Sequence, residues 1–312
     1  MRRLFPVLFL SLVGCGSKPA TKPDPKPQKK AATTRTCNPK VKGDCEKQCQ
    51  AGDVGSCVIL SQMFQLGVGV AKDPKRAEQA ALRALKLAGP ACEAGNAQAC
   101  MTLAGASFYG KGVKQDIPRG VKLVARACEL GSPDGCATLG MMYAEGQGVP
   151  ADPGQAAGLY KKACDKGHQP GCALLASVLL QGNGVARDVK RSAALYTGAC
   201  QGGVAAACAD LAVLHVQGIG VKKDLQIAAQ LSTAACKAGN GNACGNLSAM
   251  YLTGQGVKKD PEVGIALLYR SCSLGHQPAC QQLAAIDQAA KKKSKKKKRR
   301  RRRSRRRRGR SS

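Results

Sequence analysis

The fold is decided by the stretch CELGSPDGCATLGMMYAEGQGVPADPGQAAGLYKKA, residues 128–163, because its pattern is repeated along most of the chain. The first cysteine of the pattern recurs every 36 residues, and a second cysteine follows it eight residues later. A fixed period of this length indicates stacked structural units. The pairs are Cys92 and Cys100, Cys128 and Cys136, Cys164 and Cys172, Cys200 and Cys208, Cys236 and Cys244, and Cys272 and Cys280. Cys49 with Cys57 forms a seventh pair, and Cys37 with Cys45 has the same spacing.

The sequence of each unit predicts two helices joined by a turn. Gly131, three residues after the first cysteine, suits the left-handed residue that follows a helix end. Leu139 occupies a buried position in the next helix, which closes at the loop Gly-x-Gly-Val beginning at Gly146. Asp152 followed by Pro153 is an N-cap with proline in the first turn, so a second helix starts there. Such a hairpin cannot bury its apolar stripe alone, and the sequence therefore predicts an all-α solenoid of stacked helix–turn–helix repeats over residues 37–290.

One unit departs in length. Seven additional residues lie near Ala80–Leu87, and seven residues are two helical turns. We therefore expect the second helix of this unit to be longer than those of the other units. Its buried face should keep the same orientation. Other units differ at the position seven residues after the second cysteine, where Ser107, Leu179 and His215 replace an aromatic residue, and looser packing is expected there.

The repeated Gly-x-Gly-Val loop, the Asp-Pro helix start and the Ala-Cys-x-x-Gly joint resemble the Sel-1-like repeat (SLR) family, specifically its cysteine-rich Hcp-type bacterial members. The resemblance implies that the two cysteines of each joint are disulfide-bonded. A helix broken by glycine can bring their Cα atoms within disulfide reach, whereas one straight helix would hold them about 12 Å apart. Metal binding is the competing interpretation, but the cysteines lack zinc-like spacing, and we expect no metal and no cofactor.

The N-terminal residues predict export. Arg2 and Arg3 precede an apolar run, Leu4 to Val13, that is too short to span a bilayer. The run ends in Leu-Val-Gly-Cys, which resembles the lipobox of bacterial lipoproteins and predicts lipid attachment at Cys15. Residues 1–14 are then a signal peptide, and residues 15–36, rich in proline and lysine, a disordered linker. The predicted location is the bacterial outer membrane, on its periplasmic or outer face.

The C-terminal residues 291–312 contain 17 of the 50 basic residues of the chain and no acidic residue. The formal net charge is +31, and most of it lies outside the repeats. Like charges without an apolar face cannot fold, so the segment is predicted to be a disordered tail that binds polyanions. Its representative charges are Lys291, Lys295, Arg299, Arg303, Arg305 and Arg308. Anionic lipids or envelope polymers are the expected partners, and nucleic acid is not expected if the chain is exported.

No residue is a candidate for catalysis. His168 and His276 occupy the same turn position three periods apart, and His215 is expected to be a packed side chain. The resemblance raises β-lactam or peptidoglycan chemistry as an alternative, but the only Ser-x-x-Lys match, Ser294 to Lys297, lies in the tail without its companion motifs. The favoured function is a non-enzymatic scaffold that binds an extended peptide or a protein in the concave groove of the solenoid.

Overall fold

The computed structural model describes residues 37–41, 43–110, 113–288 and 292. The described residues belong to the unit Thr36–Ser312, and a first unit, Met1–Arg35, lies outside them. Every regular element in the described part of the chain is a helix. The helices are α1 (Asp44–Gln50), α2 (Val54–Leu66), α3 (Pro74–Glu93), α4 (Ala97–Tyr109), α5 (Ile117–Glu129), α6 (Pro133–Glu145), α7 (Pro153–Asp165), α8 (Gln169–Gln181), α9 (Val189–Gln201), α10 (Ala205–Gln217), α11 (Leu225–Lys237), α12 (Gly241–Thr253) and α13 (Pro261–Ser273). A further helical segment covers residues 277–288.

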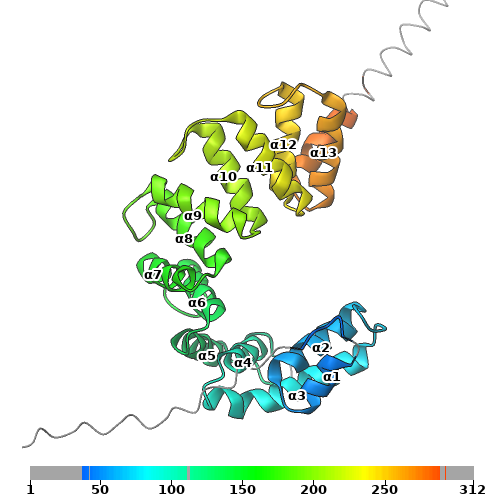
Figure 1. The fold of residues 1–312 in the computed structure, drawn as a ribbon, viewed down its shortest axis with the longest axis vertical. Helices are drawn as coiled ribbons and strands as arrows, with labels where there is room; N and C mark the ends of the chain where they lie inside the picture. Colours follow the sequence, from blue (N-terminus) through cyan, green and yellow to red (C-terminus); the bar gives the residue numbers. More distant parts are fainter. Residues whose placement is uncertain (1–36, 42, 111–112, 289–291, 293–312) are drawn as a thin grey trace, which may run out of the picture. The chain divides into compact units, whose positions relative to one another are not determined.

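The helices pack as consecutive antiparallel hairpins, which Figure 1 shows in chain order through its colours. In each hairpin an even-numbered helix, here called a first helix, packs on the odd-numbered second helix that follows it. Each second helix also packs on the first helix of the next hairpin. Contacts between neighbours in the sequence therefore build the structure, as predicted for stacked repeats.

Helix starts and ends follow the predicted signals. Each second helix from α3 onward begins after an aspartate whose side chain accepts hydrogen bonds from backbone N–H groups of the first turn, as Asp188 does from Arg191 at 3.0 Å. First helices such as α6 end at a glycine in the left-handed region, where Gly146 has φ of +70°. These caps satisfy backbone groups that a helix leaves unpaired at its ends.

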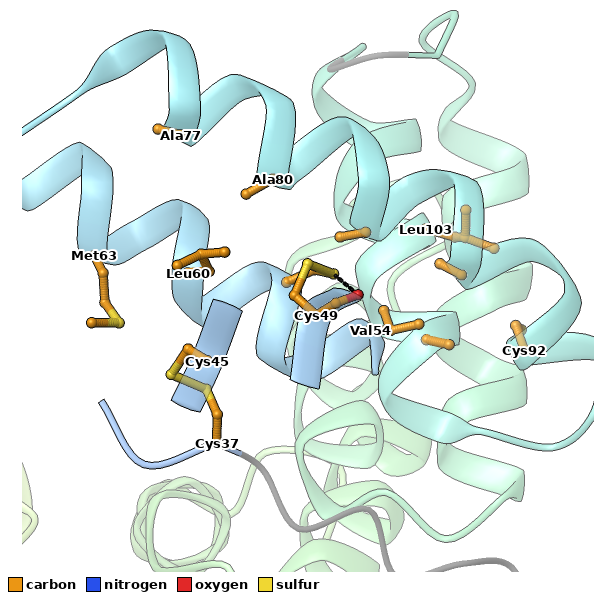
Figure 2. Packing of buried hydrophobic residues seen from close by; sticks show 14 of the residues in the cluster. Cys37, Cys45, Cys49, Val54, Leu60, Met63, Ala77, Ala80, Cys92 and Leu103 are labelled. Atoms are coloured by element: carbon orange, nitrogen blue, oxygen red, sulfur yellow. Dashed lines mark hydrogen bonds between the residues drawn. A yellow bond between two sulfur atoms is a disulfide. The ribbon is translucent and has the colours of Figure 1, made fainter. Parts of the chain in front are cut away.

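The core is built mainly from alanine, cysteine and leucine. Alanines of the second helices lie against the first helices, and Figure 2 shows this for Ala77 and Ala80 of α3, above Leu60 of α2. Both alanines are buried, at 7% and 6% exposure. Short side chains allow the helix axes to approach closely, so the chain forms a core although its whole sequence has only four phenylalanines and no tryptophan.

Helix α3 has the predicted extra length. It contains 20 residues, whereas each later second helix contains 13. Its buried alanines still recur at helical spacing through Ala84 and Ala88, so the insertion keeps one face of the helix toward the core.

Eight disulfides join the described cysteines, and each links residues eight apart. The Cα–Cα distances lie between 4.5 and 4.8 Å, within the normal range for this bond. The pairs are Cys37–Cys45, Cys49–Cys57, Cys92–Cys100, Cys128–Cys136, Cys164–Cys172, Cys200–Cys208, Cys236–Cys244 and Cys272–Cys280. Seven of these disulfides close the joint between a second helix and the helix that follows it, and Cys37–Cys45 joins the residues before α1 to α1.

The expectation of looser packing in units without the repeated aromatic residue is wrong for two of them. Ser107 and Leu179 are 2% and 6% exposed. The neighbouring Phe108 supplies the missing ring, because its side chain lies against Gly120, where an added Cβ would come within 2.4 Å of it. His215 is partly exposed, and its Nδ1 lies 3.2 Å from the carbonyl oxygen of Lys222.

Arginines link successive second helices in three places. Arg126 of α5 donates a hydrogen bond of 3.0 Å to the carbonyl of Glu93, the last residue of α3. Arg83 and Arg270 make the corresponding bonds to the carbonyls of Gln50 and Lys237, 33 residues earlier in each case. A cation at a helix C-terminus is favourable because the terminal carbonyls carry partial negative charge.

Candidate functional site

A pocket of about 800 Å³ opens between α2 and α4, with α3 as its floor. We call it the α2–α4 groove. Its apolar surface comes from side chains of all three helices, and its polar surface comes mainly from glutamines. The lining residues used below are Gln62, Gln65, Ala81, Leu82, Gln98, Met101 and Thr102.

A small and partly exposed residue stands in the floor of the groove at this repeat. The residue eight positions after the N-cap aspartate is buried in every later second helix, at 4% exposure or less. These residues are Val124, Tyr160, Tyr196, Ser232 and Leu268. The same position in α3 is Ala81, which is partly exposed and lines the groove. Leu82 and Leu85, which lie within the insertion, extend the apolar floor.

Three amide side chains at the groove have unused hydrogen-bonding capacity. Gln62, Gln65 and Gln98 make no side-chain hydrogen bond within the described part of the chain. Thr102 differs, because its hydroxyl donates its hydrogen to the carbonyl of Gln98 at 3.0 Å and keeps its lone pairs. The groove thus combines an apolar floor with polar groups that can pair with a peptide main chain.

The charge of the groove is small. Glu78 is the only charged residue among those that line it. The groove therefore offers no cation to an acidic ligand, although the chain as a whole is strongly basic.

The corresponding position between α8 and α10 is filled by the chain itself. Tyr196 of α9 is 2% exposed, and its hydroxyl lies in a hydrogen-bonded network with Ser177 of α8 and Asp210 of α10. Burial, together with the nearby Asp210 carboxylate, raises the pKa of the Tyr196 hydroxyl to about 12. Burial also raises the pKa of Asp210, while the hydrogen bond from Tyr196 acts in the opposite direction.

The two histidines of the repeated turn each stand directly before a helix. His168 is the N-cap of α8, and its Nδ1 accepts a 3.0 Å hydrogen bond from the backbone N–H of Gly171. Its other nitrogen must then carry the hydrogen, and it lies 3.0 Å from Oδ1 of Asp134. His276 has the opposite arrangement, because the hydroxyl of Ser271 donates to the carbonyl of Gly241 and its oxygen accepts from Nδ1. These contacts are structural, in agreement with the interpretation as a variable turn position.

The predicted site residues divide into two groups. The disulfide cysteines are brought together in pairs as described above. Cys15 and the tail residues Lys291, Lys295, Arg299, Arg303, Arg305 and Arg308 lie outside the described residues. The α2–α4 groove was not predicted as a distinct site, although the seven-residue insertion was the signal that marked its repeat.

Comparison with known proteins gives the family. The Sel1 repeat matches residues 55–96, 97–132, 133–168, 169–204, 205–240 and 241–276. The chain belongs to the Sel1 repeat family. Its repeats form the all-α solenoid of the SLR fold.

Solved structures of this kind include the protective antigen c5321 of uropathogenic Escherichia coli strains, which displays an SLR fold. It is 26% identical with a TM-score of 0.60, and the match covers 78% of this chain and 50% of that one, so our chain spans half the length of c5321. A Sel1 repeat protein from Oxalobacter formigenes is 26% identical with a TM-score of 0.58, covering 70% and 85%. Helicobacter pylori cysteine rich protein B is 30% identical over 42% of this chain and 94% of its own, with a TM-score of 0.35. No curated protein matches the sequence significantly.

The disulfides also bear on location. Eight such bonds form and persist in an oxidising environment outside the cytoplasm. None of the helices within the described ranges is long and apolar enough to cross a membrane.

Proposed function

We propose that the chain is a non-enzymatic scaffold that holds an extended segment of a partner protein in the α2–α4 groove. The observation that carries this proposal is an apolar floor bordered by three glutamine amides that have no side-chain hydrogen bond among the described residues. An extended peptide presents main-chain N–H and C=O groups on its edges and side chains on its faces, so it matches such a surface. A folded domain would reach the rim and leave the floor uncovered.

The experiment places a photo-crosslinking amino acid at Gln65, in the groove, and at Lys122, on the exposed surface of α5, in full-length protein in cells. We expect one identified protein to crosslink from Gln65 and not from Lys122. A synthetic peptide from the crosslinked segment should bind purified protein and lose binding on Leu82→Glu, because Leu82 is a half-exposed part of the floor. Peptide binding that is unchanged by Leu82→Glu would overturn the proposal.

The scaffold is further proposed to be anchored through lipid on Cys15. The support is the apolar run that ends at Cys15 and the oxidising location that the disulfides require. Wild-type protein should partition into the outer-membrane fraction with a modified N-terminal cysteine, and Cys15→Ser should release or stall it. A wild-type protein whose mature N-terminus is another residue would contradict the anchor.

The basic tail is proposed as a second, electrostatic attachment to anionic lipids or envelope polymers. Seventeen cations within residues 291–312 would release counterions on binding, so affinity must fall steeply with salt. Full-length protein should bind anionic vesicles and lipopolysaccharide at low salt, and a chain ending at residue 290 should not. Equal binding by the two chains, or binding that is independent of salt, would refute this role.

A further inference from the structure

The hairpin loops of successive repeats form one edge of the array, here called the loop edge, where first helices end and second helices begin. Each loop touches the start of the preceding second helix. A Cβ added to Gly220 would lie 2.2 Å from the carbonyl oxygen of Val189 in α9. One added to Gly256 would lie 2.1 Å from that of Leu225 in α11. Side chains that leave neighbouring loops therefore leave one continuous surface.

The last three loops, with the first turn of α9, place cations on this surface. Six lysine and arginine side chains are exposed there, and none makes a side-chain hydrogen bond or an ion pair within the described residues. The acidic residues nearby are Glu262 and three N-cap aspartates, whose carboxylates accept backbone N–H groups at positive helix ends. We call this surface the basic edge. Its cations are Lys190, Arg191, Lys222, Lys223, Lys258 and Lys259.

The first helices have the opposite character. Helices α2, α4, α6, α8, α10 and α12 contain no lysine or arginine, although the chain has 50 basic residues. The loop over residues 146–152 also has no cation, and it bounds the basic edge on its N-terminal side. The cations of the array are thus gathered on some of its surfaces and are missing from others.

The basic tail is attached to the array at the loop edge. Residues 277–288 follow the joint Cys272–Cys280, and Ala279 and Leu283 pack with Leu268 of α13. The segment is therefore the first helix of a further unit, and it runs from its joint toward the loop edge. Its last described residue lies three positions before Lys291, where the segment with 17 cations begins.

We propose that the basic edge lies on an anionic lipid surface once the tail has brought the chain there. This inference rests on the proposed role of the tail, and it adds a second lipid-binding surface that orients the array. Tail and edge belong to one chain, so binding of the tail gives the edge a high effective concentration at the surface. Each lysine or arginine close to an anionic leaflet strengthens binding about fivefold.

Exposed apolar side chains among these cations favour a lipid surface over a soluble polymer. Ile227 and Val263 stand in the first turns of α11 and α13 and are 39% and 38% exposed. Each follows a lysine of its loop by four residues, Lys223 and Lys259 respectively. A bilayer takes up apolar side chains at the boundary between headgroups and acyl chains, whereas a hydrated polymer offers them no apolar environment.

The test measures binding of full-length protein to phosphatidylcholine vesicles with and without phosphatidylglycerol. The edge variant replaces four lysines of the basic edge with glutamine, namely Lys222, Lys223, Lys258 and Lys259. The control variant makes the same change of net charge at four exposed lysines of second helices, namely Lys86, Lys122, Lys162 and Lys237. We expect the edge variant to bind anionic vesicles at least about tenfold more weakly than wild type. The control variant should bind nearly as tightly as wild type.

A second measurement reports which surface meets the lipid. The chain has no tryptophan, so Ile227→Trp and Met141→Trp each introduce a single fluorescent reporter. The first lies on the loop edge, and the second lies on the first helix α6, where Met141 is 40% exposed. Anionic vesicles should shift the emission of Ile227→Trp to shorter wavelength, and brominated lipid should quench it. The emission of Met141→Trp should not change.

Several outcomes would overturn the inference. These are equal binding by the edge variant and wild type, equal losses in the edge and control variants, or an emission shift for Met141→Trp without one for Ile227→Trp. A loss of polyphosphate binding in the edge variant, with no vesicle-induced shift for Ile227→Trp, would assign the edge to a soluble polymer instead. Full-length protein that ignores anionic vesicles would refute tail and edge together. The chain ending at residue 290 tests the tail separately, so the role of the tail can stand when that of the edge fails.

Discussion

Adding a side chain costs different amounts of free energy at different glycines, although many of them share a positive φ. Gly220 in a Gly-x-Gly-Val loop has φ of +69°, and an added Cβ would lie 2.2 Å from the carbonyl oxygen of Val189 at the start of α9. Gly203 has φ of +87° with no atom within 4 Å of such a Cβ. Backbone conformation alone costs an alanine about 1–2 kcal/mol at either position, and overpacking adds about 1–3 kcal/mol at the first.

Gly220→Ala should therefore reduce the free energy of unfolding by about 2–5 kcal/mol, and Gly203→Ala by about 1–2 kcal/mol. Urea denaturation followed by circular dichroism measures both. Equal losses would show that the loop gives way to the added methyl group and that the contact with α9 is not a constraint.

Asp210 makes stability depend on pH in a direction opposite to that of a salt-bridged carboxylate. Desolvation raises its pKa although the residue keeps an exposed surface, so the native state holds the proton more tightly than the unfolded chain does. The contribution of this group to stability is greatest when the carboxyl is protonated. It falls as pH rises from the pKa of the unfolded chain through the pKa of the native state.

Asp210→Asn should therefore increase thermal stability at pH 7, and the increase should shrink at pH 3. Asp287→Asn, at an exposed carboxylate near the end of the array, is the control. A loss of stability on Asp210→Asn at pH 7 would mean that the hydrogen bond from Tyr196 outweighs burial.

At the level of helices, the arginine bonds between successive second helices test how the units are joined. Arg126→Met retains most of the aliphatic stem but removes the hydrogen bond to the Glu93 carbonyl. We expect a loss of about 0.5–1 kcal/mol, since the bond is exposed but involves a cation at a helix C-terminus. Arg119→Met on the same helix, whose side chain makes no hydrogen bond or ion pair within the described residues, should be neutral. Amide exchange at the end of α3 provides the local measurement, and unchanged exchange there would contradict the link.

The sequence predicted the helices well because each unit repeats its own start and stop signals. Asp152 and Gly146 are local signals, and their effects do not depend on distant residues. The α2–α4 groove could not be found in this way, because it depends on Ala81 of one helix facing Gln62 and Thr102 of two others. The hydrogen bond from Arg126 to the carbonyl of Glu93 could not be predicted either. In the sequence Arg126 looks like an ordinary surface cation, and only the stacking of α5 on its neighbours brings it to Glu93. The insertion marked the correct repeat, but the consequence of its length was visible only after packing.

For the whole molecule, the disulfide network predicts a definite mass and connectivity. Eight bonds lower the mass of the native chain by sixteen hydrogens relative to the reduced chain. Non-reducing mass spectrometry after proteolysis should recover peptides that contain cysteines eight residues apart. Peptides linking different joints would contradict the structure.

Loss of one disulfide should reduce stability in a part of the chain that depends on the place of that disulfide in the array. Replacing Cys164 and Cys172 with alanine removes a short closed loop and should cost about 2–3 kcal/mol. In a stack of repeats this loss spreads only to neighbouring units, so amide exchange should rise in α7 and α8 while α2 and α13 stay protected. Replacing Cys37 and Cys45 should affect only α1 and α2, at the start of the array. Uniform exchange throughout the chain after the central replacement would show that the array unfolds as a single cooperative unit.

Each described disulfide joins two cysteines that follow one another in the sequence. This has a consequence for how the chain matures. A chain that enters an oxidising compartment from its N-terminus exposes both partners of a joint within nine residues of each other, before the following joint appears. Once lipid blocks Cys15, as proposed above, the first bond that an oxidant can make at each moment is therefore the native one. Enzymes that shuffle mispaired bonds are then dispensable for this chain, and its maturation is limited by the supply of oxidant and the rate of translocation.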